Sequence, residues 1–262
     1  MTILVTQRDF RAVQTLPFCY LCGKAFKQGD HKNRDHLPPQ NIFAKNDRTP
    51  ALWLPTHYDC NAAHKLLDEK IGQLISLKRY YRPSSPQNWR LKIALFPRQA
   101  LGAVTNVNVD EAIWRWIRGF HAAIYQEYMP DTRMRALVTP LPRTSNSPFG
   151  PVVDTLHPQH RNAVQLIKTN RAKRNLDSIK SNNAKFTYEC VWQQSDDKRA
   201  WLCFFAMDIY GWKDLGETGV QPSRGCAGFY ILPTGNTPVN ATRGTSTTIL
   251  VPNLDPLDPF GR

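Results

Sequence analysis

The chain has 262 residues, of which 41% are hydrophobic and 11% aromatic, enough to fill the core of one large or two small globular domains. No run of about 18 uncharged apolar residues occurs, and Arg8 and Asp9 interrupt the N-terminus before a signal-like stretch forms. We therefore expect no membrane segment and a cytoplasmic location. The net charge is +13, of which residues 1–104 contribute +9, and this makes nucleic acid the expected partner.

Six cysteines are too few and too unevenly spaced for a disulfide framework in a chain of this length. In a reducing compartment, paired cysteines more often bind a metal ion, and Cys19 and Cys22 form such a pair. Three further cysteines lie in predicted apolar strands, where we expect them to be buried as small hydrophobic residues: Cys190, Cys203 and Cys226.

The N-terminal region predicts a compact module. Residues 1–18 show no clear periodicity and are interpreted as a lead-in arm, and residues 18–81 have the order strand, strand, helix. The first strand runs through Asp35 and His36, and the second is the apolar stretch ALWLPT at 51–56. The helix is indicated by apolar residues at three- and four-residue spacing: Leu67, Ile71, Leu74 and Ile75.

The middle of the chain predicts a connector and a core helix. Residues 83–108 begin with a Pro/Ser break and are interpreted as a connector that holds one or two strands. A helix follows over VDEAIWRWIRGFHAAIYQEYMP, where apolar residues recur at helical spacing. We expect Asp110 to be its N-cap and Pro130 to end it.

The C-terminal part predicts a helix at 158–181 followed by antiparallel strands. FTYECVW and AWLCFFAMDIYGW flank QQSDDKR as a hairpin, and CAGFYIL at 226–232 is a third strand. The expected fold class is α+β, built from a zinc-stapled strand–strand–helix module and a helix-plus-antiparallel-strand domain. The expected divisions are the module at 1–82, the connector at 83–108, the second domain at 109–232 and a Pro/Asn/Thr-rich tail at 233–262.

Two pairs of metal ligands flank the predicted strands. Cys19-x-x-Cys22 precedes the first strand, and His57-x-x-Cys60 follows the second. Structural zinc takes four thiolate or imidazole ligands in a tetrahedron, commonly as two close pairs. The sequence therefore predicts a structural zinc site at these four residues. His64 is an alternative to His57, because its spacing from Cys60 also suits a metal.

The order of CYLC, RDHLPP and HYDCN followed by AAHK resembles the HNH endonuclease family over residues 19–65, about a fifth of the chain. The resemblance implies a ββα-metal fold with an Asp-His pair on the first strand and an Asn or His at the helix start. It implies that Asp35 and Asn61 bind a catalytic Mg²⁺ or Mn²⁺ and that His36 activates the attacking water. For His64, three roles stay open: phosphate contact, auxiliary ligand of the catalytic ion, and helix surface residue.

The chemistry of phosphodiester cleavage agrees with these roles. A carboxylate and a carboxamide oxygen are suitable ligands for Mg²⁺, and a histidine with a pKa near 6.5 is a good general base at neutral pH. Basic residues that surround the motif in sequence are expected to contact phosphates: Arg34, Lys45, Arg48 and Lys65. We therefore expect a metal-dependent endonuclease that acts on nucleic acid, with double-stranded DNA as the first candidate.

One feature of the family is missing. The Asn that orients the base histidine would fall near Leu52 or Trp53, and the candidate substitutes are backbone carbonyls or Asn46. The alternative function is accordingly a non-catalytic zinc-containing protein that binds nucleic acid. A second Asp-His pair, Asp30-His31, lacks the following proline and is the less favoured site. The C-terminal domain is expected to bind a protein partner or a second copy of the chain.

Overall fold

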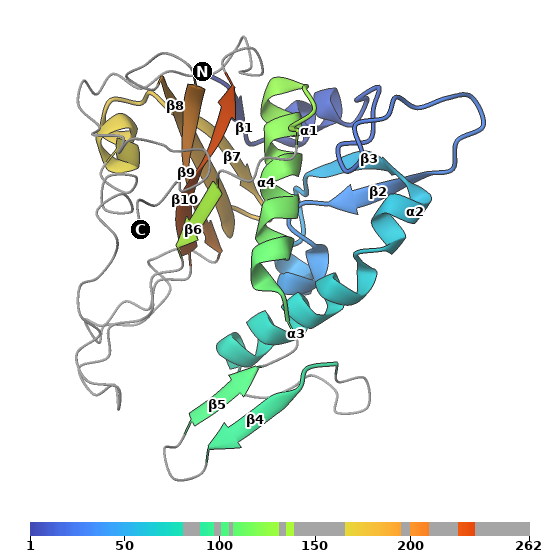
Figure 1. Cartoon of the computed structure of the whole chain (residues 1–262), viewed down its shortest axis with the longest axis vertical. Coiled ribbons are helices and arrows are strands. Elements are labelled where there is room, and N and C mark those ends of the chain that lie inside the picture. The colour runs from blue at the N-terminus through green and yellow to red at the C-terminus, as the bar shows by residue number, and fades with distance from the viewer. Residues whose placement is uncertain are drawn as a thin grey trace. The chain divides into compact units, whose positions relative to one another are not determined.

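The computed structural model describes residues 1–80, 90–96, 101–104, 107–130, 135–138, 166–194, 200–209 and 225–233. The chain divides into two compact units (Figure 1). The N-terminal unit is Thr6–Met129, and the C-terminal unit combines Met1–Val5 with Pro130–Arg262. Helices and strands are both present, as the expected α+β class requires.

The predicted boundaries at 82 and 109 differ from these units. Met1–Val5 joins the C-terminal unit because β1 (Ile3–Leu4) pairs in parallel with β7 (Asp177–Ser181). Helix α4 (Val109–Tyr125) belongs to the N-terminal unit rather than to a domain that begins at 109. An amphipathic pattern shows that a helix packs on a core, but it does not show which core.

The strands of the N-terminal unit form where the sequence predicts them. β2 (Lys32–His36) and β3 (Trp53–His57) pair antiparallel, with Asp35 opposite Leu54 and His36 opposite Trp53. The predicted lead-in arm instead contains helix α1 (Gln7–Val13). The sequence signal for this helix is a capping box, which the prediction missed. The side chains of Thr6 and Asp9 each accept a hydrogen bond from the other residue's backbone N–H.

Two helices follow the hairpin. α2 (Tyr58–Ala62) begins directly after β3, and α3 (Lys65–Tyr80) is the predicted amphipathic helix, so the order strand, strand, helix is confirmed. Two 3-10 helices at Gln40–Ile42 and Lys45–Asp47 lie in the loop between the strands. The predicted connector holds an antiparallel pair, β4 (Ile93–Phe96) and β5 (Leu101–Val104).

Helix α4 is buried on almost every side. Its N-cap is Asn108 rather than Asp110, since the Asn108 Oδ1 accepts the Glu111 N–H at 3.1 Å. Gly119 allows close packing on the loop after β2, because a Cβ there would lie 2.2 Å from a Leu37 methyl carbon. The helix thus contributes to the core of the N-terminal unit.

The C-terminal unit contains a six-stranded sheet in the order β1-β7-β8-β9-β10-β6 (Figure 1). The predicted hairpin is confirmed as β8 (Phe186–Gln194) and β9 (Ala200–Ile209), and the third strand as β10 (Gly225–Pro233). β6 (Arg135–Val138) pairs with β10 at the edge. Cys190 and Cys203 are fully buried as expected, and Cys226 lies in β10.

The predicted helix at 158–181 is wrong in its second half. Residues 166–172 are helical, Arg174 adopts a left-handed φ of 53°, and the chain then enters strand β7. Residues 158–165 and the tail at 234–262 lie outside the described residues. The helical segment covers one face of the sheet through an apolar cluster: Leu166, Ile167, Leu176, Val191, Leu202, Phe204, Phe229 and Ile231. No helix within the described ranges is long and apolar enough to cross a membrane.

Candidate metal centre and active-site cleft

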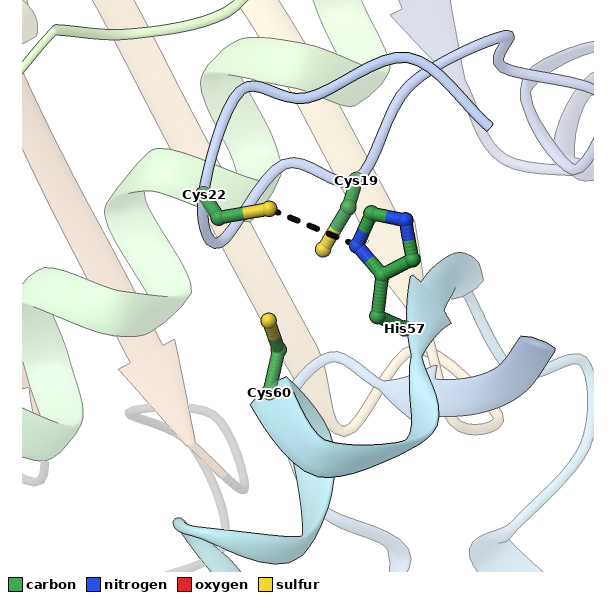
Figure 2. A group of neighbouring side chains, drawn as sticks. All are labelled: Cys19, Cys22, His57 and Cys60. Carbon is green, nitrogen blue, oxygen red and sulfur yellow. Dashed lines mark hydrogen bonds between the residues drawn. The ribbon is translucent and has the colours of Figure 1, made fainter. Parts of the chain in front are cut away.

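Three cysteines and a histidine gather in the N-terminal unit as the sequence predicts. Cys19 and Cys22 come from the loop after α1, His57 ends β3, and Cys60 lies on α2. Their ligand atoms all lie within 4.8 Å of one another and point toward a common centre (Figure 2). His64 lies outside this group, so His57 is the histidine of the cluster.

The loop that carries the first two cysteines is a tight turn. The Cys19 N–H donates to the Lys24 carbonyl at 3.0 Å, and the Gly23 N–H donates to the Cys19 carbonyl at 2.8 Å. Gly23 has a φ of +74°, and a Cβ at this position would lie 3.0 Å from the Tyr128 ring. Only glycine meets both conditions without strain, which explains the CxxCG sequence. We call residues 19–24 the knuckle.

The geometry of the cluster fits zinc. The Cys22 Sγ lies 3.4 Å from the His57 Nδ1, and sulfur and nitrogen ligands of tetrahedral zinc are separated by roughly 3.5 Å. Burial, followed by the neighbouring Cys19 and Cys22 thiols, raises the pKa of Cys60 to about 12. Thiols crowded in this way ionise together only when a cation is bound to them. The three sulfurs and one ring nitrogen could therefore hold a metal ion such as zinc.

A carboxylate supports the histidine of this cluster from behind. The His57 Nε2 lies 3.2 Å from the Asp30 Oδ2, and the same oxygen accepts the Lys27 N–H at 2.7 Å. Carboxylates commonly fix the ring of a metal-binding histidine in this way. Asp30 of the second Asp-His pair thus belongs to the metal centre, while His31 is exposed.

The Asp-His pair of the first motif lies in a neighbouring cleft of about 480 Å³. The three predicted catalytic residues, Asp35, His36 and Asn61, all line it. Residues from β2, the following loop, α2 and α3 form the rest of the wall, among them Arg34, Pro39, Gln40, Asn41, Lys65, Asp68 and Glu69. Segments up to about 35 positions apart in the sequence therefore meet in one cleft.

Each predicted catalytic side chain has a defined environment. Asp35 is only 3% exposed, and the Tyr20 hydroxyl donates a hydrogen bond to its Oδ2. His36 is half-buried, and burial lowers its pKa below the usual 6.5. The Asn61 Nδ2 donates to the Arg34 carbonyl at 3.3 Å, so the amide of Asn61 is tied to β2.

A buried ion pair lies behind the cleft. The Arg115 guanidinium of α4, 3% exposed, donates to the Asp68 carboxylate of α3. Burial outweighs the attraction of Arg115 and raises the pKa of Asp68 to about 6. Within the described residues, the Arg115 Nε and Nη1 have no hydrogen-bond partner.

Sequence reasoning missed Tyr20, Asp68 and Arg115 in this region. The position of Tyr20 between the two cysteines of CxxC is the sequence signal that could have indicated a role near the metal centre. Asp68 and Arg115 are separated by 47 positions, and no local pattern connects them.

The remaining predicted residues divide into two groups. Arg34 and Lys65 line the cleft, whereas Lys45 and Arg48 are not among its lining residues. The Arg48 Nε instead donates to the Phe43 carbonyl at 3.2 Å. The His64 Nδ1 lies 3.9 Å from the Glu111 Oε1, and His64 does not line the cleft either.

The donor set for a catalytic cation is small. Within the described residues, the cysteine cluster is the one group of three or more Cys, His, Asp or Glu residues arranged to hold a metal. Asp35 and Asn61 offer oxygen ligands in the cleft, and Mg²⁺ characteristically keeps several waters beside one or two protein oxygens. Asp35 and Asn61 are thus the two predicted ligands that offer oxygen atoms at the cleft.

Comparison with known proteins adds no relative. No protein-family model, curated protein sequence or solved structure matches the chain.

Proposed function

We propose that the N-terminal unit is an HNH-type endonuclease module that hydrolyses nucleic-acid phosphodiester bonds, with DNA as the preferred substrate. One observation carries the proposal: Asp35, His36 and Asn61 line a single cleft next to a Cys₃His cluster. The order of these residues in the sequence supports the same conclusion, because the zinc pairs and the Asp-His pair follow the family pattern.

His36 is the general base of this proposal. Pairing of β2 with β3 fixes its backbone opposite Trp53, and half-burial restricts the ring. An imidazole that is neutral at pH 7 can accept the proton of the attacking water. The position of the Asn that family members use to orient this histidine is taken by Leu52 or Trp53, neither of which can do so through its side chain. Asn46 does not line the cleft.

Asp35 and Asn61 are the proposed ligands of the divalent cation. Since the Asn61 Nδ2 bonds the Arg34 carbonyl, its Oδ1 remains as a carbonyl-type oxygen for a cation. Asp35 contributes a carboxylate oxygen from the adjacent position of the same strand. A bound Mg²⁺ would neutralise charge at the phosphate and stabilise the leaving oxygen.

Basic side chains at the cleft favour a phosphate backbone. Arg34 and Lys65 both line it, and the Arg34 guanidinium lies over the Trp53 ring at 4.8 Å from its centroid. Contacts of this kind position a nucleic-acid strand without reading its bases. The excess of positive charge in residues 1–104 raises the local concentration of such a polyanion.

The test is nicking of supercoiled plasmid by the zinc-loaded chain in Mg²⁺ or Mn²⁺. We expect His36→Ala to reduce the rate at least about 100-fold, the usual size of a general-base contribution. His31→Ala is the matched control, because His31 belongs to the other Asp-His pair and is exposed. It should retain the wild-type rate.

Two outcomes contradict the proposal. One is a wild-type protein that binds plasmid without cutting it in either metal, which would identify a zinc-containing nucleic-acid-binding protein instead. The other is cleavage that persists unchanged in His36→Ala. Parallel assays on duplex DNA, single-stranded DNA and RNA identify the preferred substrate.

A further inference from the structure

Tyr20 connects the two proposed metal sites. Its backbone lies inside the knuckle, between the cluster residues Cys19 and Cys22. Its side chain is 1% exposed, and its hydroxyl donates to the Asp35 Oδ2. One residue therefore contacts the candidate catalytic carboxylate while its neighbours supply the zinc ligands.

The knuckle determines where this hydroxyl lies. Arg118 of α4 donates through Nη2 to the Leu21 carbonyl at 2.6 Å, and the Tyr20 carbonyl lies 3.4 Å from the same nitrogen. The backbone N–H groups of Cys19 and Gly23 also donate hydrogen bonds that close the turn around Tyr20. A phenol ring has only two side-chain torsions, so a fixed backbone in a packed site leaves its oxygen little freedom.

The hydrogen bond also determines how Asp35 can bind a cation. Tyr20 occupies Oδ2, so Oδ1 is the oxygen that remains as a ligand. A carboxylate that is hydrogen-bonded on one oxygen keeps its orientation without a metal, and this lowers the cost of ordering it on binding.

We propose that Tyr20 is a positioning residue that couples the zinc cluster to the divalent-ion site, so that zinc bound at the knuckle raises the affinity of Asp35 for the second metal. This inference rests on the proposed function only for the identity of the second site, and it concerns metal binding rather than cleavage.

The first experiment measures Mn²⁺ binding to the zinc-loaded full chain by isothermal titration calorimetry without nucleic acid. We expect Tyr20→Phe to keep one zinc per chain and to bind Mn²⁺ about 10- to 100-fold more weakly, the usual effect of losing an outer-shell partner. Tyr230→Phe removes the same hydroxyl from an equally buried tyrosine of the C-terminal sheet and should leave the affinity unchanged.

The Mg²⁺ dependence of the nicking rate separates a positioning role of Tyr20 from general damage to the fold. In nicking assays, Tyr20→Phe should raise the Mg²⁺ concentration for half-maximal rate while the rate at saturating Mg²⁺ stays near that of the wild type. Equal Mn²⁺ affinities in wild type and Tyr20→Phe overturn the inference, and so does a wild type that binds no Mn²⁺. A tenfold loss of affinity in a protein that cuts nothing would support the coupling and refute only the nuclease.

The second experiment tests the coupling by a double-mutant cycle. Cys22→Ser weakens the zinc cluster at one of its two partly buried cysteines, and zinc content and circular dichroism report whether the fold persists. If Tyr20 transmits the effect, the double variant will lose less Mn²⁺-binding free energy than the sum of the losses in Cys22→Ser and Tyr20→Phe. Additive losses, or no loss in folded Cys22→Ser, contradict the coupling.

Discussion

The two units bury polar side chains for different purposes. In the C-terminal unit, a buried carboxylate and a buried amide bond the backbone, while four buried side chains of the sheet interact with one another: Tyr188, Cys190, Cys203 and Tyr230. The Asp177 carboxylate accepts the Thr2 N–H at 2.6 Å where β1 meets β7, and the Asn170 amide donates to the Leu166 carbonyl one helical turn away. Polar groups there stabilise the ends of regular elements.

In the N-terminal unit, carboxylates instead accept from side chains of distant segments. Tyr20 donates to Asp35, and Arg115 of α4 donates to Asp68 of α3. Both acceptors also line the cleft. Buried charges are costly, so a fold that keeps two carboxylates at one cleft gives up stability there, as is common at functional sites. The comparison places the candidate chemistry in the N-terminal unit.

The largest expected difference between the units concerns cysteine. Cys19→Ser should abolish stoichiometric zinc and cost the N-terminal unit at least about 4 kcal/mol, because the binding free energy of structural zinc becomes folding free energy. Cys190→Ala replaces an equally buried cysteine of the sheet and should cost only about 1–2 kcal/mol, with zinc content unchanged. Metal analysis and denaturant unfolding provide the measurements. If Cys19→Ser contained as much zinc as the wild type, Cys19 would not be a zinc ligand.

A second contrast sets a buried ion pair against an exposed one. Arg115→Met leaves the Asp68 carboxylate buried without its cation and should cost about 3–5 kcal/mol. Arg171→Met breaks the pair with Glu189 in the C-terminal unit, where Arg171 is 56% exposed, and should cost less than about 1 kcal/mol. Chemical denaturation compares the two variants.

The same contrast has an internal control. Asp68→Leu together with Arg115→Met removes both charges and should recover most of the stability lost in Arg115→Met. Similar costs for Arg115→Met and Arg171→Met would show that burial does not distinguish the two units.

A smaller effect is the loss of stability of the N-terminal unit as the pH falls. Burial lowers the pKa of His121 on α4 to about 3 from its usual 6.5. A histidine with a depressed folded pKa contributes stability above its unfolded pKa and loses it as the pH falls toward the folded value. Between pH 7 and pH 5 this group should therefore cost the N-terminal unit about 2 kcal/mol.

The His121→Gln variant measures this contribution. Between pH 7 and pH 5, its unfolding free energy should fall by about 2 kcal/mol less than that of the wild type. Identical pH profiles would show that His121 is not buried in its neutral form.

Local patterns predicted the parts of the fold that local physics determines. The two ligand pairs, the hairpin β2–β3 and helix α3 follow from spacing and periodicity, and so do β8 and β9. Asp177–Ser181 was misassigned to a helix because the basic stretch before it continues a helical pattern. Its strand conformation depends on pairing with β8, which follows it after a short turn, and with β1, which is distant in sequence.

Contacts between distant segments account for the other errors. The sequence placed α4 in the C-terminal domain, yet Arg115 and Arg118 bond to groups near positions 68 and 21. At the candidate site, Asp35, His36 and Asn61 could be predicted from their order, whereas Tyr20 and Asp68 could not. Their roles depend on which side chains the folded hairpin and helices bring together.

The most direct test of the central claim is a crystal structure of the zinc-loaded chain soaked in Mn²⁺, with anomalous scattering recorded at the zinc and manganese edges. We expect a zinc peak among Cys19, Cys22, His57 and Cys60, and a separate manganese peak bound by Asp35 and Asn61 beside His36. Zinc in its cluster with no manganese at Asp35, or manganese bound only elsewhere, would contradict the proposed active site.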